Sequence, residues 1–529
     1  MTTIAHVPLI LIRGFGGFNT EDERQVAHQG FNEGTVYPQK RGENYIYEGL
    51  ILRYLKSHWH YHDATNVVGY YSNPVAGPDS LPDALKALDP GYFAGRVLID
   101  AGTALDLVES REDPRKSLWV FRYYDFNDRS LKVYSEALMR LIDFVRDLTV
   151  VKSGEKKPPV NIIAHSMGGL IVRETIQCAY PAANRKAADA INKVVTLGTP
   201  HLGISFQGIR DFKFVDAGDE LERFNPAAQK DPANPWGYKN FSKHFPPERV
   251  LTVVGTNYKS YGTRVASALN RLASAPHEFG WTYNRSDGLV KQSAAQLPGA
   301  PRTFVHKCHG GVDSLITSRE AYEVATRFFH GDVGVKLNLL SANVKRGFDK
   351  FGKSEMFFGV SIKPRRVDFD LFHQSAEAEN CYGPFRTADF SDELKPETGM
   401  GWAGPNRLVW EGWLDTSRIS ASAMPGHAAA SRDLVMRLDF YAGERDSLGV
   451  GFSDNVIFRK QYYIRAVAPA GQEMTSSLDN IKVYLYRDEN FADTSNADEL
   501  KLANGQWTFK VEGTGFEASL GISVARVEA

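Results

Sequence analysis

The sequence predicts an α/β protein with a doubly wound, mostly parallel sheet and a cap insertion, followed by a C-terminal antiparallel β-sandwich. In the first part, short apolar runs alternate with segments of helical periodicity, as in βαβ units. After about Gly334, short alternating runs separated by Gly, Asn, Asp and Pro turns replace that pattern. The chain of 529 residues is also long for a single core. We therefore expect an α/β domain over residues 1–334 and a β-sandwich domain over residues 335–529.

The elements of the first part follow from local pattern. Strands are expected at 7–12, 66–71, 118–124, 160–164, 193–198, 249–255 and 302–308. Helices are expected at 45–59, 130–148, 169–178 and 319–329. Residues 73–113 are rich in Pro, Gly and Asp and indicate an insertion. A second, aromatic-rich insertion at 205–247 is predicted to form a cap or lid, either mobile or packed permanently on the sheet.

The second part is expected to hold about eight or more strands. They are predicted at 356–362, 367–372, 408–413, 434–441, 461–467, 481–486, 507–511 and 518–524. Trp402, Trp410 and Trp413 fall in this part. They either mark a surface for lipid, glycan or protein, or pack in the sandwich core.

Composition limits the partners and the compartment. Lys and Arg number 62 against 63 Asp and Glu, a net charge of −1, so no global field attracts nucleic acid or an anionic membrane. The chain has no apolar run long enough to span a bilayer. Cys178, Cys308 and Cys381 are few and widely spaced, which predicts no disulfide framework and a reducing compartment. The N-terminus lacks a basic region before its apolar run, so a cytoplasmic location is expected, with export by a non-Sec route left open.

The most informative motif surrounds Ser166. A β-branched strand run ends in Ala164-His165-Ser166-Met167-Gly168, and a helical pattern follows. Small residues on either side of such a serine permit a sharp strand-to-helix bend that exposes its hydroxyl oxygen. The alternative is an ordinary turn in which a serine happens to fall. The strand before it and the helix after it favour a nucleophile.

A nucleophilic serine needs a base and an acid, which follow it in chain order in sheets of this kind. Asp287 lies in an Asp-Gly turn between two predicted strands and is the expected acid; Asp313, Asp216 and Asp219 are weaker alternatives. His309 stands where the last strand stops, beside two glycines, and is the expected base. His306 alternates within that strand and is expected to pack there. His165 and His201 are expected to shape the pocket.

An acyl transfer also needs two N–H donors for the oxyanion. The residue after the nucleophile, Met167, supplies one backbone N–H. The glycine turn Arg13–Gly17 after the first strand supplies the other, at Phe15. The spacing of these glycines does not fit a dinucleotide-binding loop, so no such cofactor is expected.

Four segments together resemble lipases of the α/β-hydrolase superfamily, most closely bacterial lipases and lipases similar to GPI-inositol deacylases. The segments are 13–17, 164–169, 196–203 and 286–290. The resemblance implies Ser166 as nucleophile, Asp287 as acid and His309 as base, with Phe15 and Met167 at the oxyanion hole. It implies a carboxylic ester hydrolase acting on an ester or lipid substrate through an acyl-serine, in transient contact with a lipid interface.

The chain departs from these lipases at two points. Arg13 stands where most of them have histidine, which alters the turn beside the acyl pocket. Some bacterial members bind calcium through an aspartate closely after the catalytic histidine, and the segment His309–Asp313 does not match, so no metal and no other cofactor is predicted. A phospholipase-type effector and a hydrolase-like binding scaffold are the alternative functions, and the oligomeric state stays open.

Overall fold

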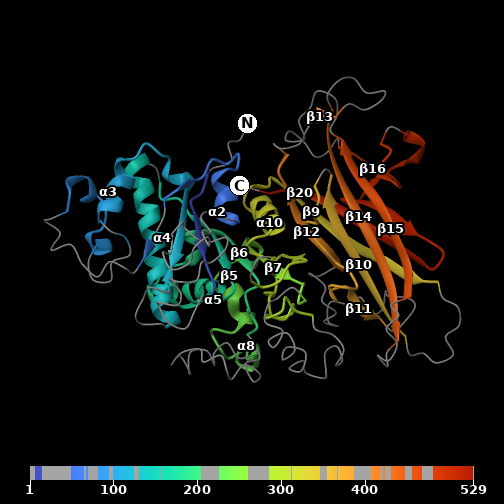
Figure 1. Ribbon diagram of the computed structural model, residues 1–529, viewed down its shortest axis with the longest axis horizontal. Helices are drawn as coiled ribbons and strands as arrows, with labels where there is room; N and C mark the ends of the chain where they lie inside the picture. The colour runs from blue at the N-terminus through green and yellow to red at the C-terminus, as the bar shows by residue number, and fades with distance from the viewer. Residues whose placement is uncertain are drawn as a thin grey trace, which may run out of the picture. The chain divides into compact units, whose positions relative to one another are not determined.

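The fold is described from a computed structural model (Figure 1). The residues it describes are 6–14, 49–64, 67–68, 81–93, 99, 101–123, 130–154, 156–203, 226–259, 285–310, 313–345, 354–365, 367–385, 407–416, 421–422, 431–446, 455–467, 481–491 and 493–527. The chain divides into two compact units. The first comprises Met1–Ala275, Ser286–Pro301 and Lys307–Tyr322; the second comprises Pro276–Arg285, Arg302–His306 and Glu323–Ala529. The boundary at 334 predicted from the sequence stays a prediction.

An eight-stranded sheet has the order β2-β4-β1-β5-β6-β7-β8, with β3 also paired to β4. The strands are β1 (Leu9–Ile12), β2 (His62–Asp63), β3 (Val67–Val68), β4 (Ser117–Arg122), β5 (Val160–His165), β6 (Ile191–Leu197), β7 (Val250–Gly255) and β8 (Arg302–Val305). The pairs from β2 to β7 run parallel. The non-sequential order is that of a doubly wound sheet, as predicted.

Helices accompany these strands (Figure 1). They are α2 (Leu50–Leu55), α3 (Ala101–Glu109), α4 (Leu131–Ser153), α5 (Met167–Glu174), α6 (Tyr180–Ala182), α8 (Pro226–Lys230) and α10 (Arg319–His330). Helix α4 begins where Ser130 accepts the backbone N–H of Val133 and ends at Gly154 in the left-handed conformation. A π-helical turn, Thr175–Ala179, joins α5 to α6.

The second unit contains two antiparallel sheets. One has the order β11-β10-β14-β15-β16-β17, with β13 on β14, and the other the order β12-β9-β20-β19-β18. The strands of the first are β10 (Ser354–Pro364), β11 (Tyr382–Phe385), β13 (Ala421–Ser422), β14 (Ser431–Asp446), β15 (Asn455–Val467), β16 (Lys482–Tyr486) and β17 (Ala497–Glu499). Those of the second are β9 (Val333–Val344), β12 (Leu408–Leu414), β18 (Leu502–Ala503), β19 (Gln506–Glu512) and β20 (Phe516–Arg526).

Aromatic side chains from both sheets meet in one core. Phe358 of β10 stacks on Phe516 of β20 with ring centroids 5.9 Å apart, and Phe440 of β14 lies 6.5 Å from Phe509 of β19. This inter-sheet packing is that of a β-sandwich, which confirms the predicted fold class. Trp410 and Trp413 are buried, so they belong to the core rather than to a surface. Trp402 lies outside the described residues.

One predicted strand of this unit is wrong. Residues 367–372 form a loop in which only Phe372 makes a bridge, to Ile362. The carboxylate of Asp370 in that loop accepts a hydrogen bond from His373, so a local side-chain contact replaces a ladder.

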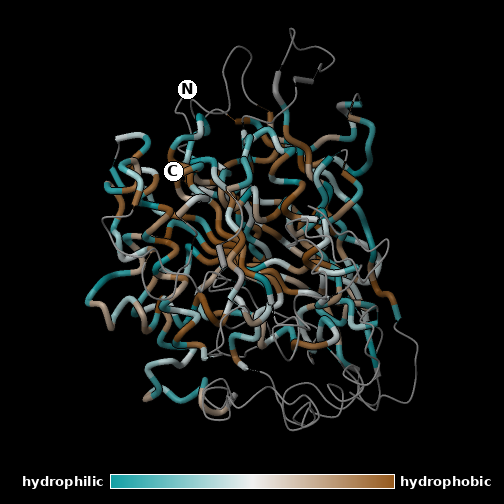
Figure 2. The backbone as a smooth tube through the Cα atoms, turned by 60° about the vertical axis from the view of Figure 1, so that its left-hand side comes forward, coloured by the Kyte–Doolittle hydropathy of each residue, from teal (hydrophilic) through white to brown (hydrophobic). Residues whose placement is uncertain are grey.

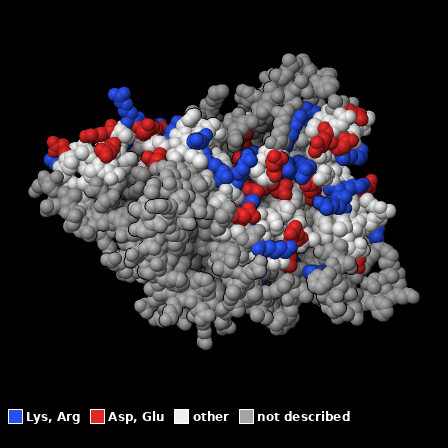
Figure 3. Space-filling model, viewed as in Figure 1, with Lys and Arg blue, Asp and Glu red and all other residues white. Residues whose placement is uncertain are grey.

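The distribution of polarity fits this architecture. In Figure 2 the hydrophobic colour gathers along the buried strands and the hydrophilic colour on outer turns. On the face drawn in Figure 3, described lysines and arginines intermingle with acidic residues, without a large continuous patch of one sign. Among the residues that the structure describes, no helix is both long and apolar enough to cross a bilayer.

Candidate active site

Ser166 occupies the bend between β5 and α5. Its backbone has φ 52° and ψ −123°, a conformation that is rare for a residue other than glycine. A Cβ placed on Gly168 would lie 2.6 Å from the carbonyl oxygen of Arg13, and one on Gly14 would lie 2.8 Å from Cβ of Ser166. Glycine at both positions therefore lets the turn after β1 pass against the bend.

His309 lies within hydrogen-bond distance of Ser166. Nε2 of the imidazole is 2.9 Å from the serine Oγ, and Nδ1 is 2.8 Å from Oδ2 of Asp287. A carboxylate only accepts hydrogen bonds, so Nδ1–H donates to Asp287, and Nε2 of the neutral ring is left to accept the serine O–H. The structure thus brings together the three residues predicted from the sequence, and all three side chains are buried.

The turn that carries Asp287 leaves one carboxylate oxygen for the imidazole. Oδ1 accepts the backbone N–H groups of Leu289 and Val290 at 3.0 and 2.8 Å. Gly288 has φ 103°, the left-handed region that this Asp-Gly turn requires. The backbone N–H of His309 also donates to the Asp287 carbonyl at 2.9 Å, which ties base and acid together a second time.

The hydrogen-bonded side chains of Ser166, His309 and Asp287 are called the relay below. The backbone of Gly198 passes very close to it. This residue has φ 55°, and a Cβ there would lie 2.9 Å from Oδ2 of Asp287 and 3.1 Å from Nδ1 of His309. Any side chain at position 198 would therefore push the acid and the base apart.

The three other histidines considered from the sequence, His165, His201 and His306, have partners other than the Ser166 hydroxyl. His165 is buried, and its Nε2–H donates to the carbonyl of His309 at 2.9 Å, so it holds the base by its backbone. Burial, with a smaller contribution from His309, keeps the pKa of His165 well below its ordinary value. His201 is also buried and lies 3.0 Å from Oγ1 of Thr196. His306 is half-buried and packs against His373, with centroids 5.1 Å apart.

Of the alternative acids, only Asp313 lies among the described residues. Asp313 is exposed and accepts a hydrogen bond from Nζ of Lys307. Asp216 and Asp219 lie outside the described residues. Phe15, the predicted oxyanion donor, also lies outside them. Met167 is the first residue of α5, where backbone N–H groups have no intrahelical acceptor.

Sequence reasoning missed a buried charged residue in the last turn of α5, Arg173. Its guanidinium donates to the carbonyls of His201 and Trp236 at 2.7 Å each, and to Oε1 of Gln177 and Gln229 at 3.0 Å each. Burial lowers its pKa to about 10. Arg173 therefore ties the helix after Ser166 to the described part of the predicted cap, where Phe241 and Phe245 are buried.

Comparisons with solved structures give distant similarities. A search of curated proteins found no match. The Bacillus licheniformis lipase BlEst2 is 14% identical over 42% of this chain and 86% of its own, with a TM-score of 0.27. The Legionella pneumophila phospholipase PlaB is 12% identical over 85% and 91%, with a TM-score of 0.31. A Listeria innocua gene product is 14% identical over 61% and 93%, also with a TM-score of 0.31.

The family comparison covers the centre of the first unit. Residues 101–233, which include α4, β5, Ser166 and α5, match the model of the PGAP1-like alpha/beta domain. Together with the parallel sheet and the bend at Ser166, this match confirms the resemblance to the α/β-hydrolase superfamily that the sequence motifs predict.

Proposed function

We propose that the chain is a serine-dependent carboxylic ester hydrolase that acts on a lipid or other ester through an acyl-serine intermediate. The observation that carries this proposal is the pair of hydrogen bonds from Ser166 to His309 and from His309 to Asp287, at 2.9 and 2.8 Å. Both distances suit proton transfer and orientation of the base.

The reaction proceeds in two halves. Oγ of Ser166 attacks the ester carbonyl carbon while its proton passes to Nε2 of His309. The imidazolium, stabilised by the carboxylate of Asp287, then gives that proton to the leaving alcohol. In the second half, water loses a proton to Nε2 and attacks the acyl carbon, and the same proton returns to Ser166 as the acid leaves.

The oxyanion of each tetrahedral intermediate needs backbone donors. The N–H of Met167 points from the start of α5, where the helix dipole also favours negative charge. We assign the second donor to Phe15. The close approach of Gly14 to Ser166, in which a Cβ on Gly14 would lie 2.8 Å from Cβ of Ser166, supports that assignment.

The proposal is tested with esters of increasing acyl length on wild type, Ser166→Ala, His309→Ala and Asp287→Asn. We expect Ser166→Ala and His309→Ala to lose at least about 10³-fold in kcat/KM, and Asp287→Asn to lose on the order of 10⁴-fold. His306→Ala is the matched control, because this half-buried histidine packs against His373 instead, and we expect its rate to stay within about twofold of wild type.

Covalent labelling gives a second readout. A fluorophosphonate should modify the tryptic peptide that contains Ser166 in wild type and leave it unmodified in Ser166→Ala. Wild-type rates in Ser166→Ala would refute the mechanism and favour a hydrolase-like binding scaffold. A rate that rises with acyl length only above the solubility limit of the ester would assign a lipase rather than an esterase.

A further inference from the structure

The backbone of His309, the base of the relay, is held on both sides. Its N–H donates to the carbonyl of Asp287 at 2.9 Å, and its carbonyl accepts the Nε2–H of His165, also at 2.9 Å. His309 lies in a bend after the end of β8 and directly before Gly310, a residue type that leaves the backbone free to rotate. These two hydrogen bonds therefore fix a peptide that no regular strand orders.

The side chain of His165 starts from a fixed point. His165 is the last residue of β5, opposite Leu197 of β6, and β5 also pairs with β1 on its other side. His165 is only 3% exposed. A Cβ on Gly14 would lie 2.7 Å from Nδ1 of the imidazole, so the backbone of Gly14 passes against that edge of the ring. With Nε2 bonded to the carbonyl of His309, the donor has little freedom to move.

The contact requires a neutral ring with its proton on Nε2. A backbone carbonyl only accepts hydrogen bonds, so Nε2 of His165 must carry a hydrogen. Burial keeps the pKa of His165 well below its ordinary value, which leaves the ring neutral near pH 7. The ring centroids of His165 and His309 are 4.9 Å apart. A charged ring at that distance would oppose the positive charge that His309 gains with the serine proton, whereas a neutral donor does not.

This arrangement couples the base to the nucleophile. His165 directly precedes Ser166, whose Oγ lies 2.9 Å from Nε2 of His309. The end of β5 thus carries both the nucleophile and the support of the base. Proton transfer depends steeply on the distance between these two groups, so the support affects the rate.

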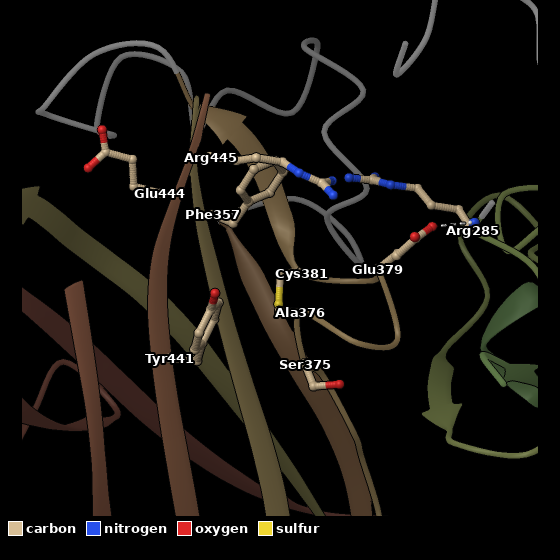
Figure 4. Close-up of a pocket in the computed structure, with 9 residues that line it drawn as sticks. All are labelled: Arg285, Phe357, Ser375, Ala376, Glu379, Cys381, Tyr441, Glu444 and Arg445. Atoms are coloured by element: carbon tan, nitrogen blue, oxygen red, sulfur yellow. Dashed lines mark hydrogen bonds between the residues drawn. The ribbon is translucent and has the colours of Figure 1, made fainter. Parts of the chain in front are cut away.

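The β-rich unit holds a histidine in the same manner. Ser375 lies in the wall of a pocket of this unit (Figure 4). Its Oγ is 3.1 Å from Nε2 of His373, whose Nδ1 is 2.7 Å from Oδ2 of Asp370. The carbonyl of His373 accepts the Nδ2–H of Asn380 at 2.6 Å. Oγ of Ser375 also accepts the backbone N–H of Ala378 and closes a turn, so these groups order a loop.

The amide of Asn380 therefore does for His373 what the imidazole of His165 does for His309. Both are uncharged N–H donors to the carbonyl of a histidine whose ring lies between an aspartate and a serine. The parallel indicates what position 165 needs, which is a neutral N–H donor rather than an aromatic ring.

We propose that His165 is a positioning residue for the base: its Nε2–H holds the backbone of His309, so that the imidazole of His309 stays within reach of Ser166. This inference rests on the proposed function, because it assigns a role in the same reaction. His165 acts through His309 and takes up no proton itself.

The test compares two replacements of His165. Phenylalanine keeps a planar ring and removes the donor, and glutamine removes the ring and keeps a neutral N–H donor. Rates are expressed per site that a fluorophosphonate labels exhaustively, so that unfolded protein is not counted. We expect His165→Phe to lower kcat for a soluble ester by about 10- to 100-fold with KM within about twofold, because a displaced base affects the transition state more than binding. His165→Gln should keep kcat within about threefold of wild type.

A second readout needs no substrate. The proton shared by Nδ1 of His309 and Asp287 gives a downfield proton NMR resonance, which is assigned by its loss in His309→Gln. We expect the resonance to persist in His165→Gln and to broaden or vanish in His165→Phe, because a displaced base exchanges this proton with water. Wild-type hydrolysis by Ser166→Ala would refute the proposed function, and the resonance would still test the positioning, so the two failures are distinguishable.

His330→Phe is the matched control, because it replaces another buried histidine, at the end of α10. Its kcat per labelled site and its resonance should equal those of wild type. His165→Leu removes the donor with a smaller side chain and replaces His165→Phe if that variant does not fold by circular dichroism. Wild-type kcat in the variant without a donor, equal losses in that variant and in His165→Gln, or a lost kcat beside an unchanged resonance would each overturn the proposal.

Discussion

The reactive conformation of Ser166 depends on two neighbouring glycines, Gly14 and Gly168. The serine adopts φ 52° because β5 must turn into α5 within one residue. That conformation costs on the order of 1–3 kcal/mol and needs support from its surroundings. Gly168 permits this support because the carbonyl oxygens of Arg13 and Ile12 lie where a side chain would need space. Gly14 permits it because the side chains of His165 and Ser166 lie equally close.

The substitution Gly168→Ala tests this packing. Alanine gains up to about 1 kcal/mol of helix propensity over glycine. The new Cβ, however, would lie 2.6 Å from the carbonyl oxygen of Arg13 and 2.8 Å from that of Ile12. Both are backbone atoms at the end of β1, which cannot give way as easily as a flexible side chain. We expect the collision to dominate and to lower the free energy of unfolding by about 1–3 kcal/mol in urea titrations, with a loss of ester hydrolysis.

Gly334→Ala is the control for this change. The nearest atom to a Cβ there is a side-chain methyl carbon of Val527 at 3.4 Å, an ordinary contact. Its stability should stay within about 0.5 kcal/mol of wild type. A Gly168→Ala protein as stable as the Gly334→Ala protein would contradict the role assigned to the turn after β1.

The sequence predicts these residues of the first unit because their signals are local. A strand run, a small-x-Ser-x-Gly turn and an Asp-Gly turn are each readable within a few positions. The conformations of Arg285 and Glu379, with φ of 41° and 52°, carry no such signal. Neither arginine nor glutamate is a residue type that favours the left-handed region, so the sequence gives no indication of these two conformations.

At the scale of the element, helix α5 depends on contacts from far along the chain. Arg173 is buried, and its hydrogen bonds reach His201, Gln229 and Trp236. A charged residue in a helical pattern is ordinarily expected on the solvent side. Its burial could not be predicted, because the acceptors come from segments up to 63 residues away.

Replacing Arg173 with methionine should test this anchoring. Methionine fills a similar volume but removes the donor to the carbonyls of His201 and Trp236 and to the side chains of Gln177 and Gln229. We expect the free energy of unfolding to fall by about 3 kcal/mol or more, measured in urea with an unchanged m-value.

Arg185→Met is the comparison for that variant. Arg185 pairs with Asp143 at the surface, where such ion pairs contribute about 0–1 kcal/mol. Equal losses for the two variants would show that the Arg173 hydrogen bonds add nothing beyond an exposed pair.

At the scale of the whole molecule, the hydrophobic pattern of the sequence predicts the fold class better than it predicts the individual strands. The change of pattern near Gly334 correctly indicates a β-sandwich after an α/β unit. Strands β9 and β11 are nevertheless absent from the prediction, and residues 367–372 are wrongly expected to form a strand. β9 begins directly after α10, at the predicted boundary. The loop at 367–372 is held instead by hydrogen bonds of the side chains of Asp370, Gln374 and Asn380. Such side-chain networks leave no periodic signal.

Buried neutral histidines link the stability of the fold to pH. Burial lowers the pKa of His165 and of His201 well below the ordinary value, with Coulombic contributions from His309 and from Arg173 respectively. In the unfolded chain both regain a pKa of about 6.5. As the pH falls below that value, the unfolded state binds protons that the folded state does not, so unfolding becomes more favourable.

We therefore expect the free energy of unfolding to be independent of these two groups above about pH 7.5 and to decline as the pH falls from about 6.5 to 5, by up to about 1.4 kcal/mol per pH unit for each histidine. Urea titrations at each pH measure this slope. His201→Gln removes one of the two titrating groups. It should therefore reduce the slope by up to about 1.4 kcal/mol per pH unit, the contribution of one proton. His58→Gln, which changes an exposed histidine, should leave it as in wild type. Equal slopes in wild type and His201→Gln would mean that position 201 does not hold a neutral imidazole in the folded state.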